Sequence, residues 1–118
     1  MSTHNQIDLV EFPAASPDDL AATRGFFTAV FGWQFTDYGD GYSDTHDSGV
    51  GSGINASEPG ECSAMPLAVV YVTDIEAARA SVIAAGGALM GEIYEFPGGR
   101  RFHFTEPSGN ELAIWSDK

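Results

Sequence analysis

The sequence predicts a single α+β domain made of two successive β-α-β-β-β modules. Each half of the chain carries a strand signal, a capped helix and then three further strand signals, in the same order. The 118 residues are 43% hydrophobic and 12% aromatic, which suffices for one core and argues against disordered and fibrous classes. We place the first module at about residues 7–56, a linker at about 57–65 and the second module at about 66–116.

The first module opens with a strand and a helix that has clear ends. Residues 7–12 read as the strand, and Ser16 followed by Pro17 reads as an N-cap with proline at the first helical position. Leu20, Phe27, Val30 and Phe31 recur near helical spacing, and Gly32 predicts a left-handed end. Three strands are expected after it, at 33–38, 42–47 and 50–56, the first two joined by a hairpin at Gly39-Asp40-Gly41.

The second module repeats this order. Residues 67–72 form a continuous apolar strand, and Thr73-Asp74-Ile75-Glu76 reads as a capping box that opens a helix ending at Gly86-Gly87. The expected buried stripe of that helix is Ile75, Ala78, Val82 and Ala85. Strands are then predicted at 88–96, 100–105 and 111–115. A ferredoxin-like sandwich also has two helices, but it has only four strands, whereas about eight strand signals are present here.

The charge balance and the cysteine usage restrict the classes of partner. Five Lys and Arg against 17 Asp and Glu give a net charge of −12, which would repel nucleic acid and anionic lipid. We therefore expect no nucleic-acid partner and no membrane partner. A single cysteine, Cys62, cannot form an internal disulfide, and no signal-peptide pattern opens the chain, so a cytoplasmic location is expected.

Several short motifs, in order, resemble the vicinal oxygen chelate superfamily of glyoxalases, bleomycin-resistance proteins and extradiol dioxygenases. They run through nearly the whole chain: Glu11-Phe12-Pro13, Phe26-Phe27, Val30-Phe31-Gly32-Trp33, Tyr71-Val72-Thr73-Asp74, Ala84-Ala85-Gly86-Gly87 and Phe104-Thr105-Glu106-Pro107-Ser108-Gly109-Asn110. The resemblance implies two βαβββ modules that form an open, partly barrel-like cleft of mixed sheet with the helices outside. It also implies a homodimer, for which an unpaired sheet edge gives a physical motive.

Enzymes of this family hold a divalent metal with His, Gln or Glu side chains on cleft-facing strand positions. By resemblance those positions fall here on Leu9, Leu67 and Ala113, none of which can bind a metal, and a fourth falls near Ser52 or Ile54. We therefore expect no metal cofactor. The less favoured alternative is a divalent metal held elsewhere, for example by Asp44, His46 and Asp47.

Strand alternation predicts which side chains would line the cleft. The candidate catalytic residues are Glu11, which could be a buried general base or a solvated rim residue, and His103, which could be an acid, a base or a structural hydrogen-bond partner. Arg101 could clamp a carboxylate with its planar fork or could offset the acidic surface. The candidate ligand-binding residues are Leu9, Leu67, Val69, Tyr71, Arg101, Glu111, Ala113 and Trp115.

Three functions remain open at this point. The first is binding of a small, partly aromatic molecule without a metal, which the apolar ligand positions and the aromatic lining favour. The second is an enzyme of the lyase, isomerase or dioxygenase kind, with an unorthodox metal or with Glu11 and His103 as acid and base. The third is an accessory module without a ligand. The fold cannot choose among them, because function resides in the site.

Overall fold

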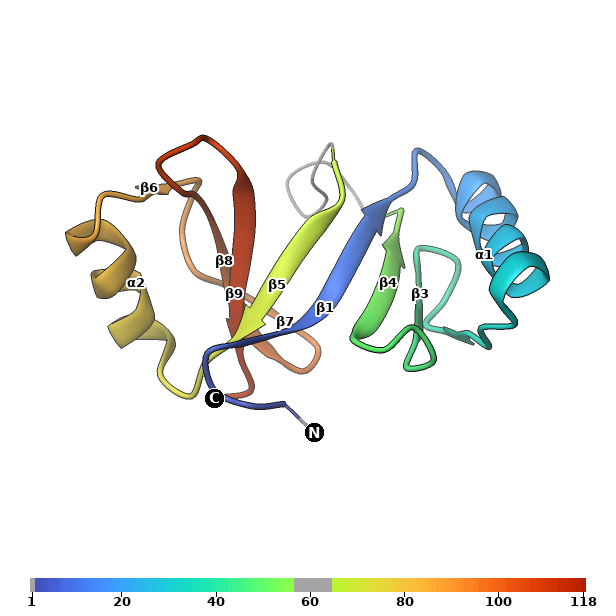
Figure 1. The fold of residues 1–118 in the computed structure, drawn as a ribbon, viewed down its shortest axis with the longest axis horizontal. Coiled ribbons are helices and arrows are strands. Elements are labelled where there is room, and N and C mark those ends of the chain that lie inside the picture. The colour runs from blue at the N-terminus through green and yellow to red at the C-terminus, as the bar shows by residue number, and fades with distance from the viewer. Residues whose placement is uncertain (1, 57–64) are drawn as a thin grey trace. The chain divides into compact units, whose positions relative to one another are not determined.

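The computed structural model describes residues 2–56 and 65–118, and the predicted linker at 57–65 lies almost wholly outside them. The chain forms two compact units (Figure 1). We call Leu9–Leu67 the N-terminal module, and Ala68–Lys118 together with the first eight residues the C-terminal module. The α+β class and the succession of two helix-bearing modules are as predicted.

The N-terminal module follows the predicted order β-α-β-β-β. Its elements are β1 (Gln6–Pro13), of which it contains the part from Leu9 on, α1 (Pro17–Phe31), β2 (Thr36–Asp37), β3 (Tyr42–Thr45) and β4 (Gly51–Asn55). The strands lie in the order β2-β3-β4-β1, with β1 and β4 parallel and the other pairs antiparallel (Figure 1). The strand β2 is much shorter than the predicted 33–38, because Trp33 and Phe35 pack their rings against Phe27 of α1 instead.

The ends of α1 confirm the sequence signals. The Ser16 side chain accepts a hydrogen bond from the backbone N–H of Asp19, and Gly32 ends the helix at φ 75°. The predicted apolar stripe is only partly buried, however. Leu20 is 2% exposed, whereas Val30 and Phe31 are 55% and 56% exposed.

The C-terminal module contains β5 (Leu67–Tyr71), α2 (Ile75–Ala84), β6 (Ala88–Leu89), β7 (Tyr94–Phe96), β8 (Gly99–Thr105) and β9 (Glu111–Ser116). Its strands lie in the order β5-β9-β8-β6, and β7 also pairs with β8. The parallel pairing of β5 with β9 mirrors that of β1 with β4. The core between this sheet and α2 is apolar and consists of Val72, Ile75, Phe102 and Ile114, with Val70, Ala78, Val82, Leu89, Ile93 and Phe104 packed at its edge.

The predicted single strand at 88–96 is wrong, because the chain divides there into β6 and β7. Leu89 pairs with Phe104, and Tyr94 pairs with Arg101. The five residue steps from Leu89 to Tyr94 therefore lie opposite only three residue steps of β8. The two additional residues form a bulge that contains Gly91 at φ 106°, a conformation that favours glycine. The bulge separates the two short strands while both remain paired with β8.

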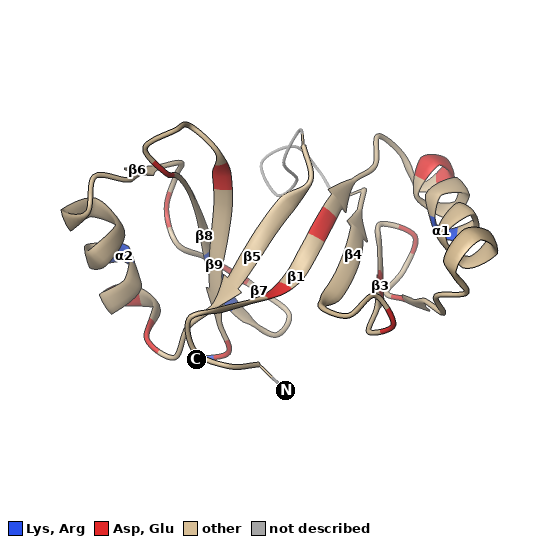
Figure 2. Ribbon diagram, viewed as in Figure 1, with Lys and Arg blue, Asp and Glu red and all other residues tan. Residues whose placement is uncertain are grey.

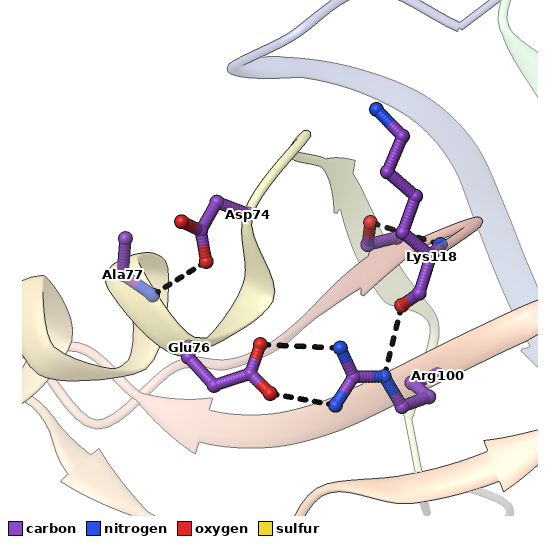
Figure 3. Close-up of polar contacts among 6 residues, drawn as sticks. Asp74, Glu76, Ala77, Arg100 and Lys118 are labelled. Atoms are coloured by element: carbon purple, nitrogen blue, oxygen red, sulfur yellow. Dashed lines mark hydrogen bonds and ion pairs between the residues drawn. The ribbon is translucent and has the colours of Figure 1, made fainter.

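The start of α2 also differs from the prediction. Asp74, rather than Thr73, is the N-cap, and its carboxylate accepts a hydrogen bond from the backbone N–H of Ala77 (Figure 3). Thr73 is instead hydrogen-bonded to the ring of His4. At the other end Ala85 is exposed, so it does not continue the buried stripe as predicted.

Glu76 pairs with Arg100 instead of completing a capping box. The carboxylate accepts two hydrogen bonds from the guanidinium, at 2.7 and 3.1 Å, and Arg100 Nε also donates to the backbone oxygen of Lys118 (Figure 3). Hydrogen bonding by Arg100 holds the pKa of Glu76 below its ordinary value. The pair therefore links α2 to β8 and the C-terminal residues.

This pair makes a small, pH-dependent contribution to stability. Because the pKa of Glu76 is lowered in the folded state, the stabilisation is complete above the ordinary glutamate pKa of about 4.3 and is lost as the pH falls through the lowered value. Glu76→Gln should thus be slightly less stable than the wild type at neutral pH and equal to it in acid. Urea unfolding at a series of pH values measures this, with the exposed Glu92→Gln as the charge-matched control.

The acidic residues are distributed over both modules rather than gathered on one (Figure 2). Both helices begin with acids, at Asp18 and Asp19 in α1 and at Glu76 in α2, where the positive end of the helix dipole favours them. Within the described ranges, no helix has the length and apolar character that a membrane span requires.

Candidate functional site

The sheet of the C-terminal module has one apolar face and one mixed polar and aromatic face. Phe102 and Ile114 point toward α2 and join the core. Since strand side chains alternate, the neighbouring residues Arg101, His103 and Trp115 lie on the opposite face, as predicted. We call this opposite face the ligand face, and it carries seven of the ten predicted site residues: Val69, Tyr71, Arg101, His103, Glu111, Ala113 and Trp115.

Four residues in register form a row across the ligand face. Tyr71 pairs with Trp115, Trp115 with Arg101, and Arg101 with Tyr94. The rings of Tyr71 and Trp115 meet edge to face at 5.0 Å, and the guanidinium carbon of Arg101 lies 6.0 Å from the centre of the Tyr94 ring. The row therefore consists of three aromatic side chains and one cation, which lies between Trp115 and Tyr94.

Hydrogen bonds fix the outer end of this row. The Trp115 indole N–H donates to Asp8 at 3.1 Å, and the Tyr71 hydroxyl donates to Asp117 at 2.8 Å. The bond to Asp117 raises the pKa of the Tyr71 hydroxyl, because it favours the protonated form. Both rings are thus held in defined orientations, with Phe96 lying against Trp115 at 6.1 Å.

His103 occupies the next position on the ligand face and is 6% exposed. Its Nδ1 lies 2.8 Å from a carboxylate oxygen of Glu111. Its Nε2 lies 2.9 Å from the hydroxyl oxygen of Tyr94 and 3.1 Å from Nη2 of Arg101. Three strands, β7, β8 and β9, therefore supply one connected polar group, which we call the His103 cluster (Tyr94, Arg101, His103 and Glu111).

The N-terminal module has a smaller polar group around Glu11. This residue is 3% exposed, so it is buried and is not a solvated rim residue. Its carboxylate lies 3.3 Å from both the hydroxyl oxygen of Tyr42 and the amide nitrogen of Asn55, two neutral donors. A side chain at Gly53 would collide with Tyr42, since its Cβ would lie 2.2 Å from the hydroxyl oxygen. Glycine at this position therefore leaves room for the tyrosine.

The resemblance implies a fourth position near Ser52 or Ile54 on β4, without fixing which residue occupies it. These residues pair with Val10 and Phe12, and Phe12 packs on Phe27 of α1, so they belong to the helix side of the sheet. The residues of β4 that share a face with Leu9 and Glu11 are Gly51, Gly53 and Asn55. The first two of these have no side-chain donor, and Asn55 contacts Glu11.

Sequence reasoning missed three residues of these groups: Tyr42, Asn55 and Tyr94. Tyr94 could have been found from the Pro97-Gly98 turn, because a two-residue hairpin loop pairs Phe96 with Gly99 and hence Tyr94 with Arg101. Asn55 and Tyr42 depend on the parallel pairing of β1 with β4, which no local signal reveals. Of the remaining predicted site residues, Leu9 and Glu11 lie on β1, and Leu67 is both the first residue of β5 and the last residue of the N-terminal module.

The side chains at the metal positions implied by the resemblance are apolar. Leu67 and Ala113 are fully buried hydrocarbon, and Leu9 is half-buried. Among residues 2–56 and 65–118, no cluster of three or more His, Cys, Asp or Glu side chains is arranged to hold a metal, and this includes the hairpin with His46. The described residues therefore do not fit the family's metal.

Comparison with known proteins gives a family and a fold. Residues 11–114 match the model of the glyoxalase/bleomycin resistance protein/dioxygenase superfamily. Proteins named "Putative glyoxylase CFP32" from Mycobacterium bovis and Mycobacterium tuberculosis are each 28% identical over 96% of this chain. The chain spans 45% of the length of these relatives.

Two solved structures share the fold at low sequence identity. One, described as an NAD-dependent benzaldehyde dehydrogenase from Legionella pneumophila, superimposes with a TM-score of 0.75 at 15% identity, covering 93% of this chain and 98% of its own. The other is a Mn(II)-bound glyoxalase from Novosphingobium aromaticivorans, with a TM-score of 0.67 at 21% identity, covering 99% of this chain and 40% of its own. These likenesses establish the fold alone.

Proposed function

Because the chain belongs to the glyoxalase/bleomycin resistance protein/dioxygenase superfamily, we propose that it binds a small, partly aromatic molecule on the ligand face without the usual family metal. The observation that carries this proposal is the row Tyr71, Trp115, Arg101 and Tyr94. Aromatic side chains beside a few placed polar groups are the usual lining of a site for small organic molecules.

The position of the cation in this row supports a role in binding. Arg101 is 8% exposed and lies on the sheet face opposite the apolar core, so it adds nothing to the packing against α2. Its guanidinium contacts the His103 ring and lies over the Tyr94 ring, so a cation is held within the aromatic row, where its planar fork can meet a ligand carboxylate. We infer that this cation takes part in recognition.

The donor set argues for metal-independent binding. The three side chains at the implied metal positions are Leu9, Leu67 and Ala113, and hydrocarbon cannot replace the hydration shell of a divalent cation. Elemental analysis of protein purified without chelator or affinity metal tests this directly. A stoichiometric divalent metal that survives dialysis would contradict it.

The two tryptophans allow a sharp test of ligand binding. In a Trp33→Phe variant the emission comes from Trp115 alone, and in a Trp115→Phe variant it comes from Trp33, which packs among Phe27 and Phe31 of the other module. We expect some members of a panel of antibiotics and aromatic metabolites to change the emission of the first variant only and to raise the Tm of the wild-type protein. Equal responses from both variants, or none across the panel, would refute binding at the ligand face.

An acid–base enzyme is the second candidate, and the burial of Glu11 favours it. Glu11 is 3% exposed and accepts hydrogen bonds from Tyr42 and Asn55, and a buried, positioned carboxylate can serve as a general base. This candidate requires a turnover that Glu11→Gln or His103→Gln abolishes, or a bound metal that either change releases. Unaltered turnover in both variants would remove these residues from the mechanism. If no ligand, no turnover and no metal were found, an accessory module would be favoured.

Self-association and location stay proposals that follow from the family and the composition. We propose a homodimer, which sedimentation equilibrium at several protein concentrations would distinguish from a monomer. We propose a reducing, cytoplasmic compartment because the chain has a single cysteine.

A further inference from the structure

The His103 imidazole lies between one group that only accepts hydrogen bonds and another that only donates them. On the Nδ1 side is the carboxylate of Glu111, at 2.8 Å. On the Nε2 side is the guanidinium of Arg101, whose Nε and Nη2 lie at 3.3 and 3.1 Å. An ionised carboxylate has no hydrogen to donate, and a guanidinium has no lone pair with which to accept.

These two neighbours fix the tautomer of the ring. Both contacts are satisfied together when the ring carries a hydrogen on Nδ1, toward the Glu111 carboxylate, and a lone pair on Nε2, toward Arg101. The hydroxyl of Tyr94, at 2.9 Å from Nε2, could donate or accept and does not by itself decide. With a hydrogen on Nε2, the ring nitrogen could no longer accept from the guanidinium.

We infer that Glu111 is a positioning residue for the ligand face, acting through the tautomer of His103 to hold the guanidinium of Arg101 in place. The order of contacts is linear, from Glu111 to His103 to Arg101, and runs across β9 and β8. Arg101 stands in the centre of the aromatic row, so its orientation sets where the cation lies between Trp115 and Tyr94. The contacts from Glu111 to Arg101 are independent of the proposed function, whereas the statement that the held guanidinium serves a ligand rests on it.

A merely structural ion pair between Glu111 and His103 would behave differently. Such a pair is strongest when the ring is doubly protonated, and it places no demand on Nε2. The positioning role requires the opposite, a neutral ring with a free lone pair directed at Arg101. Observing the protonation of each ring nitrogen therefore separates the two interpretations.

Long-range ¹⁵N–¹H correlation spectra of ligand-free, ¹⁵N-labelled protein at neutral pH provide that observation. The chain has three histidines, and a His103→Gln variant assigns the signals of His103. We expect a protonated, pyrrole-type Nδ1 and an unprotonated, pyridine-type Nε2. A protonated Nε2 in the wild-type protein would overturn the inference, whether or not a ligand is ever found.

Variants at position 111 test the action on Arg101. Glu111→Leu should shift the ring toward the Nε2–H tautomer and speed exchange of the Arg101 Nε–H roughly tenfold, since the His103 lone pair no longer accepts from it. Glu111→Gln should keep the wild-type tautomer, because the amide oxygen still accepts from Nδ1–H. Glu95→Leu, the same change at an exposed position of β7, is the control and should alter neither signal. An unchanged tautomer and unchanged exchange in Glu111→Leu would contradict the positioning role.

Discussion

Replacing Phe102 with alanine is expected to lower the free energy of unfolding by about 3–5 kcal/mol, a large part of the stability of a domain of this size. The side chain is 0% exposed and packs with Val72, Ile75 and Ile114 between the sheet and α2. Truncation would remove most of the ring contacts and leave a cavity that the paired β8 strand cannot readily fill. Urea unfolding followed by far-UV circular dichroism measures the loss.

The matched control for this variant is Phe104→Ala, two residues further along the same strand face. Phe104 is half-buried at the edge of the same core, so the same truncation should cost clearly less. Phe102→Leu keeps most of the volume and should also be milder. Equal losses for Phe102→Ala and Phe104→Ala would show that the core is centred elsewhere than the packing indicates.

Phe102 also connects stability to the site. It lies between Arg101 and His103 in sequence, and alternation sends its ring into the core while its two neighbours enter the ligand face. The core thus fixes the strand that presents the guanidinium and the imidazole. Loss of the Phe102 ring should loosen both neighbours, which the Nε–H exchange of Arg101 would report in the surviving folded protein.

Local signals in the sequence were sufficient for most of the fold. Ser16, Pro17 and Gly32 define the ends of α1 because capping depends on neighbouring residues alone. The face assignment of β8 was also correct, since a period of two needs no tertiary information. The observed elements and the solved structures that share the fold confirm the α+β arrangement that these signals predict.

The errors arose where a distant contact outweighs a local preference. Thr73 satisfies the capping-box pattern, but it binds His4, and Asp74 takes its place at the helix start. Glu76, the other half of the box, binds Arg100 on β8. In both cases a partner far away in sequence replaces the local one, and propensity cannot anticipate it.

The sequence predicted which side chains of the candidate site share a face of the sheet, but not the hydrogen bonds that join them. Alternation placed Arg101 and His103 on the correct side, whereas Tyr94 joins them only through the pairing of β7 with β8 that the Pro97-Gly98 turn sets. The face on which Ser52 and Ile54 lie was not predicted, since the register of parallel strands is set by pairing across the sheet. Register is the information that a single sequence lacks.

A second large effect is expected at Gly99, where β8 begins beside the end of β9. A Cβ built there would lie 2.0 Å from the backbone oxygen of Ser116 and 2.9 Å from its carbonyl carbon, so Gly99→Ala forces the two strands apart. We expect a loss of about 3 kcal/mol in the free energy of unfolding, because backbone atoms cannot move aside as a side chain can. Thermal and urea unfolding of the variant measure it.

Gly41 provides the control for Gly99, because a Cβ there meets no atom of the described residues within 4 Å and the position has no positive φ. Gly41→Ala should therefore change stability by less than about 0.5 kcal/mol. The clash at Gly99 also affects the site, since Arg100 pairs with Ser116 and Arg101 pairs with Trp115 in the next two rungs. Separating the strands at Gly99 should shift the Trp115 emission of the Trp33→Phe protein even without a ligand. An unchanged emission spectrum would mean that the aromatic row is held by Asp8 and Asp117 rather than by the pairing of β8 with β9.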